Sequence, residues 1–172
     1  MESEKISAGK FSRNYGLILG LILIVLTVLM YVTGMQLEGT QWPMYIYYAI
    51  FPLTIFYAIN QYKKTQGNLL SLSDAIKIGL ATAVISALVF TVYNLLFNYV
   101  IDPEFTQQVM KAEMDRQLES GALTEEMIEK SASVREVLTN PFVGSAIFIA
   151  FSAIFGLIYS LIGGLIMKRE QQ

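Results

Sequence analysis

FVGSAIFIAFSAIFGLIYSLIGGLIM, residues 142–167, is a run without a single Asp, Glu, Lys, Arg or His. Three further runs of the same kind precede it, over residues 15–33, 43–60 and 78–100. A helix needs roughly 20 apolar residues to cross the hydrocarbon core of a bilayer. The sequence therefore predicts an all-α integral membrane protein. We expect residues 1–172 to form a single membrane domain, a four-helix bundle with spans at about 14–34, 43–61, 75–100 and 142–167.

The composition supports the same placement, because 54% hydrophobic and 15% charged residues make the chain too apolar for a soluble protein of its length. The chain has neither histidine nor cysteine, which are the usual ligands of zinc, copper, haem iron and iron–sulfur clusters. We therefore expect no cofactor and no bound metal. A formal net charge of −2, without a basic cluster beside aromatic residues, argues against a nucleic-acid partner.

Lysine and arginine are distributed unequally between the two ends of the predicted bundle. Those on one side are Lys5, Lys10, Arg13, Lys63, Lys64, Lys77, Lys168 and Arg169, and those on the other are Lys111, Arg116, Lys130 and Arg135. Basic residues near the ends of spans stay on the cytoplasmic side. This distribution predicts a multi-pass protein of the inner (cytoplasmic) membrane with both termini in the cytoplasm.

Residues 101–141 form the longest stretch outside the predicted spans and read as an extracytoplasmic, acidic two-helix insert. Asp102-Pro103 is typical of an N-cap followed by proline at the first helical position, and Gly121 is typical of a helix stop. A second helix is expected from Thr124 as N-cap to the Asn140-Pro141 boundary. The sequence thus predicts a helical hairpin between spans three and four.

Each predicted insert helix carries an apolar stripe. The stripes are Met110, Met114 and Leu118 on the first helix, and Met127, Ile128 and Leu138 on the second. We expect them to pack on each other and to leave the carboxylates facing outward. Glu125, Glu126 and Glu129 are then a possible partner surface, although carboxylates on surface helices also form ordinary solvated faces.

Small residues recur at intervals of four in two of the predicted spans. They are Ser152, Gly156, Ser160 and Gly164 in span four, and Gly79, Ala83 and Ala87 in span three. Helices in a bilayer associate through close packing, so small residues at this spacing mark contact faces. We expect these faces to close the bundle itself, and the alternative is a homodimer seam.

Asn94 and Asn98 are strong polar groups within span three. An unpaired amide in hydrocarbon costs several kcal/mol, so both side chains must reach a partner, a water or the interface. We expect Asn94 to make a hydrogen bond between helices, the alternative being a small cavity lined with Thr91 and Tyr93. Pro52 in span two predicts a kink.

Catalytic machinery is absent from the sequence. A nucleophile with its base, a metal set or a basic phosphate clamp would be required, and the spans contain no carboxylate. Pumps and proton-coupled carriers also usually keep an ionisable residue within the membrane. We therefore expect that the protein is not an enzyme.

Several motifs resemble one family of bacterial membrane proteins. They are Ser73–Gly79 before span three, Tyr99–Phe105 after it, Glu125–Glu129 in the insert, Asn140-Pro141, and Lys168-Arg169-Glu170 after the last span. With these motifs the chain resembles domain-of-unknown-function family 4199, over half its length by motif and elsewhere by span pattern. The resemblance implies a four-pass bacterial inner-membrane protein without an assigned activity.

Together these patterns favour a non-enzymatic accessory or scaffold protein whose partners are the lipid bilayer and a membrane protein or a second copy of itself. The alternative is a small oligomeric transporter or channel. A cavity lined by polar side chains at mid-bilayer depth would favour transport, whereas a tightly packed bundle would favour the accessory role.

Overall fold

The computed structural model describes residues 7–169, so Lys5 and Glu170 lie outside the described residues. Within that range the secondary structure is helical apart from one isolated β-bridge. In chain order the elements are α1 (Ala8–Val32), α2 (Trp42–Thr65), α3 (Leu72–Leu96), the π-helical turn η1 (Phe97–Ile101), α4 (Phe105–Glu119), α5 (Glu125–Lys130), α6 (Ala132–Thr139) and α7 (Pro141–Met167).

Four helical segments are long and apolar enough to cross a membrane: Ala8–Val32, Trp42–Thr65, Leu72–Ile101 and Pro141–Met167. The predicted all-α, four-span fold class is therefore confirmed. The four segments are longer than the predicted spans, because α1 and α3 begin before their apolar runs and α2 ends after its own. Pro52 lies inside α2, which remains one continuous helix.

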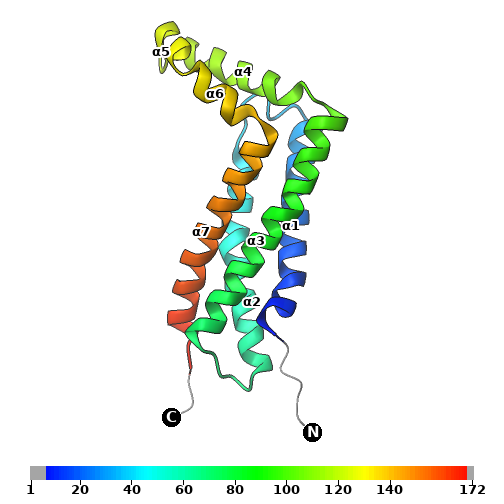
Figure 1. The fold of residues 1–172 in the computed structure, drawn as a ribbon, viewed down its shortest axis with the longest axis vertical. Helices are drawn as coiled ribbons and strands as arrows, with labels where there is room; N and C mark the ends of the chain where they lie inside the picture. Colours follow the sequence, from blue (N-terminus) through cyan, green and yellow to red (C-terminus); the bar gives the residue numbers. More distant parts are fainter. Residues whose placement is uncertain (1–6, 170–172) are drawn as a thin grey trace.

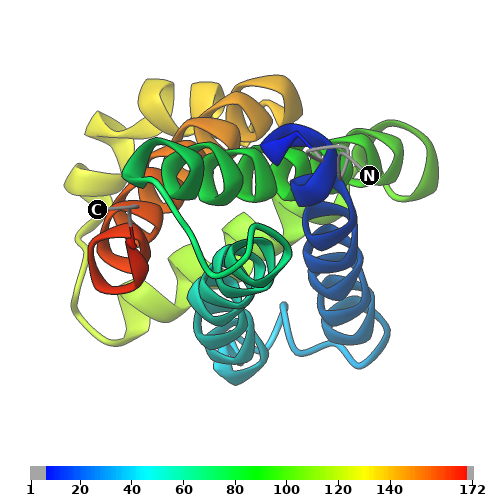
Figure 2. The same cartoon turned by 90° about the horizontal axis from the view of Figure 1, so that it is seen from below.

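The four long helices run side by side, and α4, α5 and α6 lie across one end of them (Figure 1). We call this end the insert end, and the opposite end, where α1 begins and α7 finishes, the terminal end. Helix α3 packs most extensively against α1 and α7, and α2 packs less extensively on its neighbours. Figure 2 shows α2 on the side of α3 that faces both α1 and α7.

Short polar caps define where the spans begin. The Ser71 hydroxyl accepts a hydrogen bond from the backbone N–H of Asp74, at 3.1 Å, and starts α3. The Asn140 side chain accepts from the backbone N–H groups of Phe142 and Val143, with Pro141 in the first turn of α7. These groups satisfy helix donors that would otherwise be unpaired.

The terminal end is tied together by the backbone. Leu70 and Arg169 exchange two N–H···O bonds, of 2.8 and 3.0 Å. The Lys63 ammonium donates to the carbonyl of Met167, at 2.7 Å. The connection between α2 and α3 is thereby fastened to the end of α7.

Helices α3 and α7 meet through small side chains. A Cβ added at Gly79 would lie 2.3 Å from the Ser160 Cβ, and one added at Gly156 would lie 2.5 Å from the Ala83 Cβ. Both distances are far below van der Waals contact, so the backbones approach too closely to admit even a methyl group at either glycine. Close approach of this kind is how membrane helices gain packing energy.

The same antiparallel register continues in both directions. Toward the terminal end, a Cβ added at Gly164 would lie 2.9 Å from the Ala75 Cβ. Toward the insert end, the next step of four residues brings Ala87 level with Ser152, and both are buried. The two small-residue series that the sequence singled out thus face each other within one chain.

Helix α1 packs against the other side of α3 through close contacts at glycines as well. A Cβ on Gly16 would lie 2.7 Å from the Ile85 Cβ, and one on Gly20 would lie 2.8 Å from the Val89 Cβ. Gly163 of α7 leaves similar room for Phe56 of α2. Close glycine contacts therefore hold all four spans together.

The insert is helical as predicted, but its second helix is split at Ser131 into α5 and α6. The Ser131 hydroxyl donates to the carbonyl oxygens of Met127 and Ile128, and the Arg135 guanidinium also donates to the carbonyl of Ile128. The Met127 carbonyl still accepts the backbone N–H of Ser131, whereas side chains supply the donors to the Ile128 carbonyl, which a continuous helix would pair with a backbone N–H. Thr124 does cap α5, and Gly121, with φ +71°, follows the end of α4.

The N-cap predicted at Asp102 is wrong. Helix α4 begins at Phe105, and the Asp102 carboxylate instead accepts a hydrogen bond from the Tyr31 hydroxyl of α1, at 3.1 Å. The reason is the π-helical turn η1, whose last hydrogen bond runs from the Asp102 N–H to the carbonyl of Phe97. That turn moves Asp102 toward α1 rather than to the start of α4.

The packing predicted between the insert stripes fails on α5 and α6. Met127 is 50% exposed and Leu138 is 48% exposed, so neither is covered by α4. A polar contact with α4 is present, because the Arg135 guanidinium lies 2.8 Å from the Met114 sulfur. The apolar side chains Met127, Val134, Val137 and Leu138 remain about half exposed.

Replacing Gly156 by leucine should destabilise the bundle by about 1 to 3 kcal/mol, because the new side chain must enter the contact with Ala83. Thermal unfolding in mild detergent measures the loss. The matched control is Gly9→Leu, since a Cβ on Gly9 meets nothing within 4 Å, and it should stay within about 0.5 kcal/mol of wild type. Equal stability of the two variants would contradict the α3–α7 contact.

Candidate functional site: a cavity beneath α4

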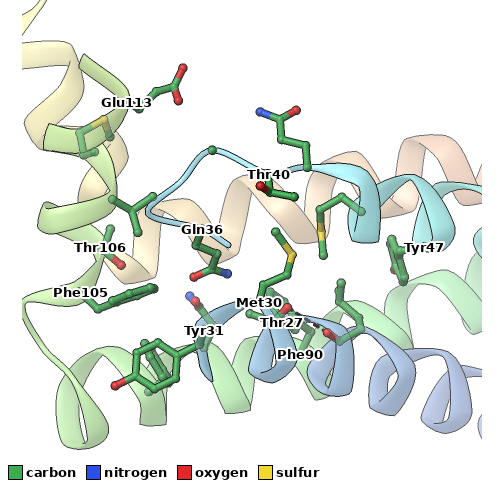
Figure 3. Close-up of a pocket in the computed structure, with 18 of the residues that line it drawn as sticks. Thr27, Met30, Tyr31, Gln36, Thr40, Tyr47, Phe90, Phe105, Thr106 and Glu113 are labelled. Carbon is green, nitrogen blue, oxygen red and sulfur yellow. Dashed lines mark hydrogen bonds between the residues drawn. The ribbon is translucent and has the colours of Figure 1, made fainter. Parts of the chain in front are cut away.

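A cavity of about 650 Å³ opens between α1, α2 and α3 at the insert end and lies beneath α4 (Figure 3). Its apolar lining includes Leu23, Met30, Met44, Phe90, Phe97 and Phe148, and its polar lining includes Thr27, Gln36, Thr40, Tyr47, Tyr93 and Asn94. From the end of α1 to Leu23 the cavity descends roughly 14 Å into the bundle, at 1.5 Å per residue. This volume is within the usual range of small-molecule sites.

The cavity is closed toward the terminal end. Below Leu23, the fully buried side chains of Leu19, Ile55 and Ile59 fill the space between α1, α2 and α3, and α1 approaches α3 closely at Gly16 and Gly20. On the other side of α3, the small-residue contact with α7 fills the space from Ser152 onward. The cavity is therefore open at one end of the bundle and sealed at the other.

Two tyrosine hydroxyls on the cavity wall have unused hydrogen-bonding capacity. Tyr47 is 5% exposed, and its hydroxyl makes no hydrogen bond of ordinary geometry. It lies near the Ser86 hydroxyl, which is also without a partner. The buried Tyr93 hydroxyl is unpartnered as well. Buried polar groups are normally paired because an unmade bond costs about 1 to 3 kcal/mol, so these donors are available to a bound molecule.

A chain of polar side chains, which we call the polar clasp, runs along one wall of the cavity. Thr106 of α4 donates to the side-chain oxygen of Asn98, at 2.5 Å. The Asn98 amide donates to the side-chain and backbone oxygens of Asn94, at 3.1 and 2.8 Å. The Asn94 amide donates to the Ser145 hydroxyl of α7, at 3.2 Å. The clasp joins α4, α3 and α7.

Asn94 thus makes a bond between two spans and also lines the cavity, combining the two roles that the sequence left open. Asn98 lies in the π-helical turn η1, which begins at Phe97. Its side-chain amide donates a hydrogen bond to the backbone carbonyl of Asn94, and this bond makes Asn98 part of the polar clasp. A π-turn is often found at functional sites. Of the two residues expected to line a cavity with Asn94, Tyr93 does so and Thr91 does not; the buried Thr91 hydroxyl has no partner.

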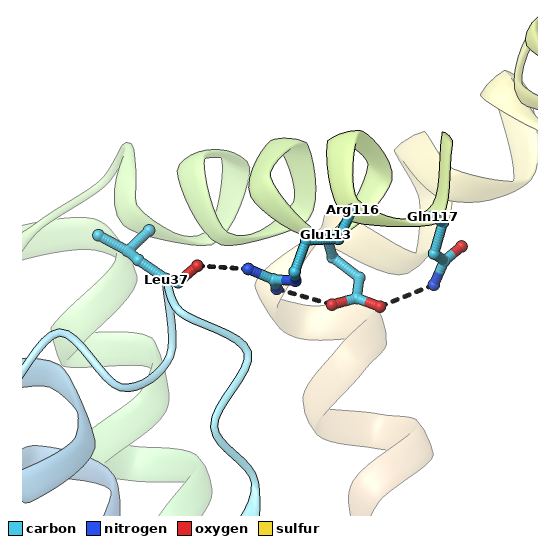
Figure 4. A network of polar contacts seen from close by, with 4 residues as sticks. All are labelled: Leu37, Glu113, Arg116 and Gln117. Carbon is cyan, nitrogen blue, oxygen red and sulfur yellow. Dashed lines mark hydrogen bonds and ion pairs between the residues drawn. The ribbon is translucent and has the colours of Figure 1, made fainter. Parts of the chain in front are cut away.

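Helix α4 covers the cavity and is fastened at both ends. At its far end the Arg116 guanidinium donates to the backbone carbonyl of Leu37, at 2.5 Å, and to the Glu113 carboxylate, at 2.7 Å (Figure 4). Gln117 donates to the other Glu113 oxygen, at 2.8 Å. These bonds, that of Arg116 foremost, hold the pKa of Glu113 below its usual range. Gly39 permits this contact, because a Cβ there would lie 2.8 Å from the Arg116 guanidinium.

At its near end α4 is held by aromatic packing. The centroid of the Phe105 ring lies 4.7 Å from that of the Tyr31 ring and 5.7 Å from that of the Phe97 ring, and both pairs meet edge to face. Such pairs contribute about 0.5 to 1.5 kcal/mol beyond the area they bury. Phe105 is buried, so the start of α4 is anchored between α1 and η1.

The structure separates the predicted site residues into three places. The small residues of spans three and four form the closed floor, and Asn94 and Asn98 form the polar clasp. Glu125, Glu126 and Glu129 are exposed on α5, and none of them lines the cavity. Among the described residues, no group of three or more acidic side chains is close enough to hold a metal ion.

Sequence reasoning missed most of the cavity lining. One signal was available on α1, where Leu23, Thr27 and Tyr31 recur every four residues and line the same wall. Polar residues at helical spacing within a span indicate a face turned toward protein rather than lipid. The contributions of Glu113 and Arg116 could not be read from the sequence, because they depend on how α4 folds over the bundle.

The polar clasp predicts a measurable coupling between Asn98 and Thr106. Asn98→Ala and Thr106→Val should each destabilise the protein, and their double-mutant cycle should give a coupling of about 0.5 to 3 kcal/mol. Unfolding in detergent measures each term. Pairing Asn98→Ala with Thr65→Val should be additive, because the Thr65 hydroxyl bonds only to Tyr62 at the terminal end. Additivity of the Asn98 and Thr106 changes would contradict the clasp.

Comparison with known proteins agrees with this architecture. No curated protein and no solved structure matches the chain significantly. Residues 14–169 match the family described as "Protein of unknown function (DUF4199)", a match that begins within α1 and includes α2 to α7. The chain is therefore a multi-pass membrane protein that belongs to the DUF4199 family.

Proposed function

We propose that the protein is a non-enzymatic accessory or scaffold protein of the bacterial inner membrane, which acts by binding rather than by moving a solute across the bilayer. The observation that carries this proposal is the sealed floor of the cavity. A solute that entered beneath α4 would meet the fully buried side chains of Leu19 and Ile55 and the contact of Gly20 with Val89, which has no room even for a methyl group.

The absence of reactive groups supports the non-enzymatic part of the proposal. The chain has no histidine or cysteine, and the ionisable side chains on the cavity wall are Glu113, Arg116 and the tyrosines. Glu113 and Arg116 bind each other and hold α4 in place. The arrangement therefore favours recognition over proton transfer or nucleophilic attack.

The insert offers the recognition surface for a protein partner. Glu125, Glu126 and Glu129 are exposed on α5, and the ion pair of Glu126 is with Lys130 of the same helix, at 2.6 Å. The carboxylates of Glu125 and Glu129 take no ion pair within the described chain. A surface of one sign steers a partner of the opposite sign and selects against others. The expected partner is a membrane protein with a basic surface.

The orientation that we propose places both termini in the cytoplasm and α4, α5 and α6 outside it. This follows from the concentration of Lys and Arg at the terminal end. Among the described residues, those at the terminal end are Lys10, Arg13, Lys63, Lys64, Lys77, Lys168 and Arg169. The insert then meets partners from the extracytoplasmic side.

A second function, transport by several copies together, is favoured by one observation. Thr27, Tyr47 and Asn94 bring polar groups into a cavity within the spans, as a substrate site in a transporter would require. Transport through the chain would need α3 to separate from α1 and α7, which would break the closest contacts of the bundle.

The accessory role predicts that one acidic surface selects the partner. The partner is crosslinked to the protein in native membranes and co-purified with it. The triple variant Glu125→Lys, Glu126→Lys, Glu129→Lys should recover at least tenfold less of this partner than wild type does, because electrostatic attraction becomes repulsion. Its matched control is Asp115→Lys, Glu119→Lys, Glu136→Lys, which makes the same change in net charge at other exposed positions of the insert.

The control should retain the partner, and both variants should unfold at the wild-type temperature. Equal recovery by wild type and both variants would contradict a role for α5 in recognition. Equal loss from both variants would show a response to net charge alone and would contradict a specific surface.

A further inference from the structure

The cavity beneath α4 borders a second cavity. This second cavity has a volume of about 480 Å³ and lies between α2 and α7. Tyr47, Tyr48 and Phe148 line both. These three side chains form the boundary between the two cavities, so a molecule that occupied both would pass between them.

The second cavity is a groove on the face of the bundle that meets lipid. Phe151 is 55% exposed and Phe155 is 47% exposed, and both lie in the middle of a candidate span. Their rings and that of Tyr159 follow one another along α7, with centroids 6.4 Å apart at each step. Phe51 of α2 closes the opposite wall, with its ring 6.1 Å from that of Tyr159.

This aromatic groove suits a hydrocarbon chain. It follows α7 from Phe148 to Tyr159, which is roughly 16 Å at 1.5 Å per residue, and it is centred near the middle of the span Pro141–Met167. Its wall is apolar apart from the Ser152 and tyrosine hydroxyls. A lipid tail that entered this groove from the insert end would run along α7 past the middle of the bilayer.

The cavity beneath α4 suits an uncharged head with oxygen acceptors. The Tyr47 and Tyr93 hydroxyls are buried and unpartnered. The guanidinium of Arg116 is already bound by Leu37 and Glu113, so the cavity wall offers no free cation to a phosphate. Burying a phosphate without a cation would be costly, whereas a hydroxyl, ester or carbonyl oxygen could accept bonds from the tyrosines.

We propose that the two adjacent cavities bind one uncharged amphipathic lipid, with one hydrocarbon chain along the α2–α7 groove and an oxygen-bearing head beneath α4. The lipid reaches the site laterally, from the leaflet at the insert end, through the opening between α2 and α7. This site is separate from the acidic surface of α5 and does not depend on the accessory role. Diacylglycerols and prenylated quinones share the required chemistry.

The test uses a diacylglycerol with a photoreactive diazirine in one acyl chain, present in nanodiscs of phosphatidylcholine with the full-length protein. A phosphatidylglycerol with the same acyl chains is the charged-head control. After irradiation, the diacylglycerol should label peptides from residues 47–51 and 151–159 about tenfold more than the phosphatidylglycerol does. An unlabelled prenylated quinone is then added as a competitor. Suppression of the labelling at a lower concentration than unlabelled diacylglycerol requires identifies the quinone as the preferred lipid, and suppression only at a higher concentration identifies the diacylglycerol.

The double variant Tyr47→Phe, Tyr93→Phe should reduce the labelling about tenfold, because it removes two hydrogen bonds to the head. Removing two unpartnered hydroxyls should leave the thermal stability of the lipid-free protein unchanged or raise it, a result that a structural role for these hydroxyls would not give. The matched control Tyr45→Phe, Tyr99→Phe changes two exposed tyrosines outside both cavities and should label like wild type.

Equal labelling by the two probes would overturn the proposal, since the site would not then select an uncharged head. Wild-type labelling of the Tyr47 and Tyr93 variant would overturn the placement of the head beneath α4. Labelling of the exposed face of α1 to the same extent as the groove would reduce the groove to ordinary lipid contact.

Discussion

The close contact between α3 and α7 is the interaction on which the rest of the structure depends. Helices already surrounded by hydrocarbon gain nothing from the hydrophobic effect when they meet, so their association rests on packing and hydrogen bonds. Gly79 against Ser160 and Gly156 against Ala83 supply that packing. Because α1 packs on the other side of α3, this one contact sets the position of three spans.

Toward the insert end, the residues at the contact between α3 and α7 change from small to large, and the cavity lies at this level of the bundle. Beyond the small residues, the rings of Phe90 and Phe148 meet, with centroids 5.2 Å apart, and Asn94 bonds to Ser145. Larger side chains hold the helices together here through rings and amides rather than through close backbones. Space then remains between α1, α2 and α3, and α4 covers it.

The sequence predicted the parts of the fold that follow from local pattern. Apolar length located the spans, Asn140-Pro141 located the start of α7, and the spacing of Gly156 and Ser160 identified a contact face. It could not predict the π-helical turn at Phe97 or the break at Ser131, because these depend on side chains that compete with backbone hydrogen bonds. The cavity was beyond prediction for a related reason, since Glu113 and Thr27 come together only through the tertiary fold.

The most direct measurement of this account is disulfide formation between α3 and α7, in a chain that has no cysteine of its own. Ala87→Cys with Ser152→Cys should form an intrachain disulfide rapidly, seen by mass spectrometry as one linked peptide pair in monomeric protein. Ala83→Cys with Ser152→Cys, which is one helical turn out of register, should react much more slowly. Equal rates for the two pairs, or disulfides between two chains in place of one, would contradict the register that organises the bundle.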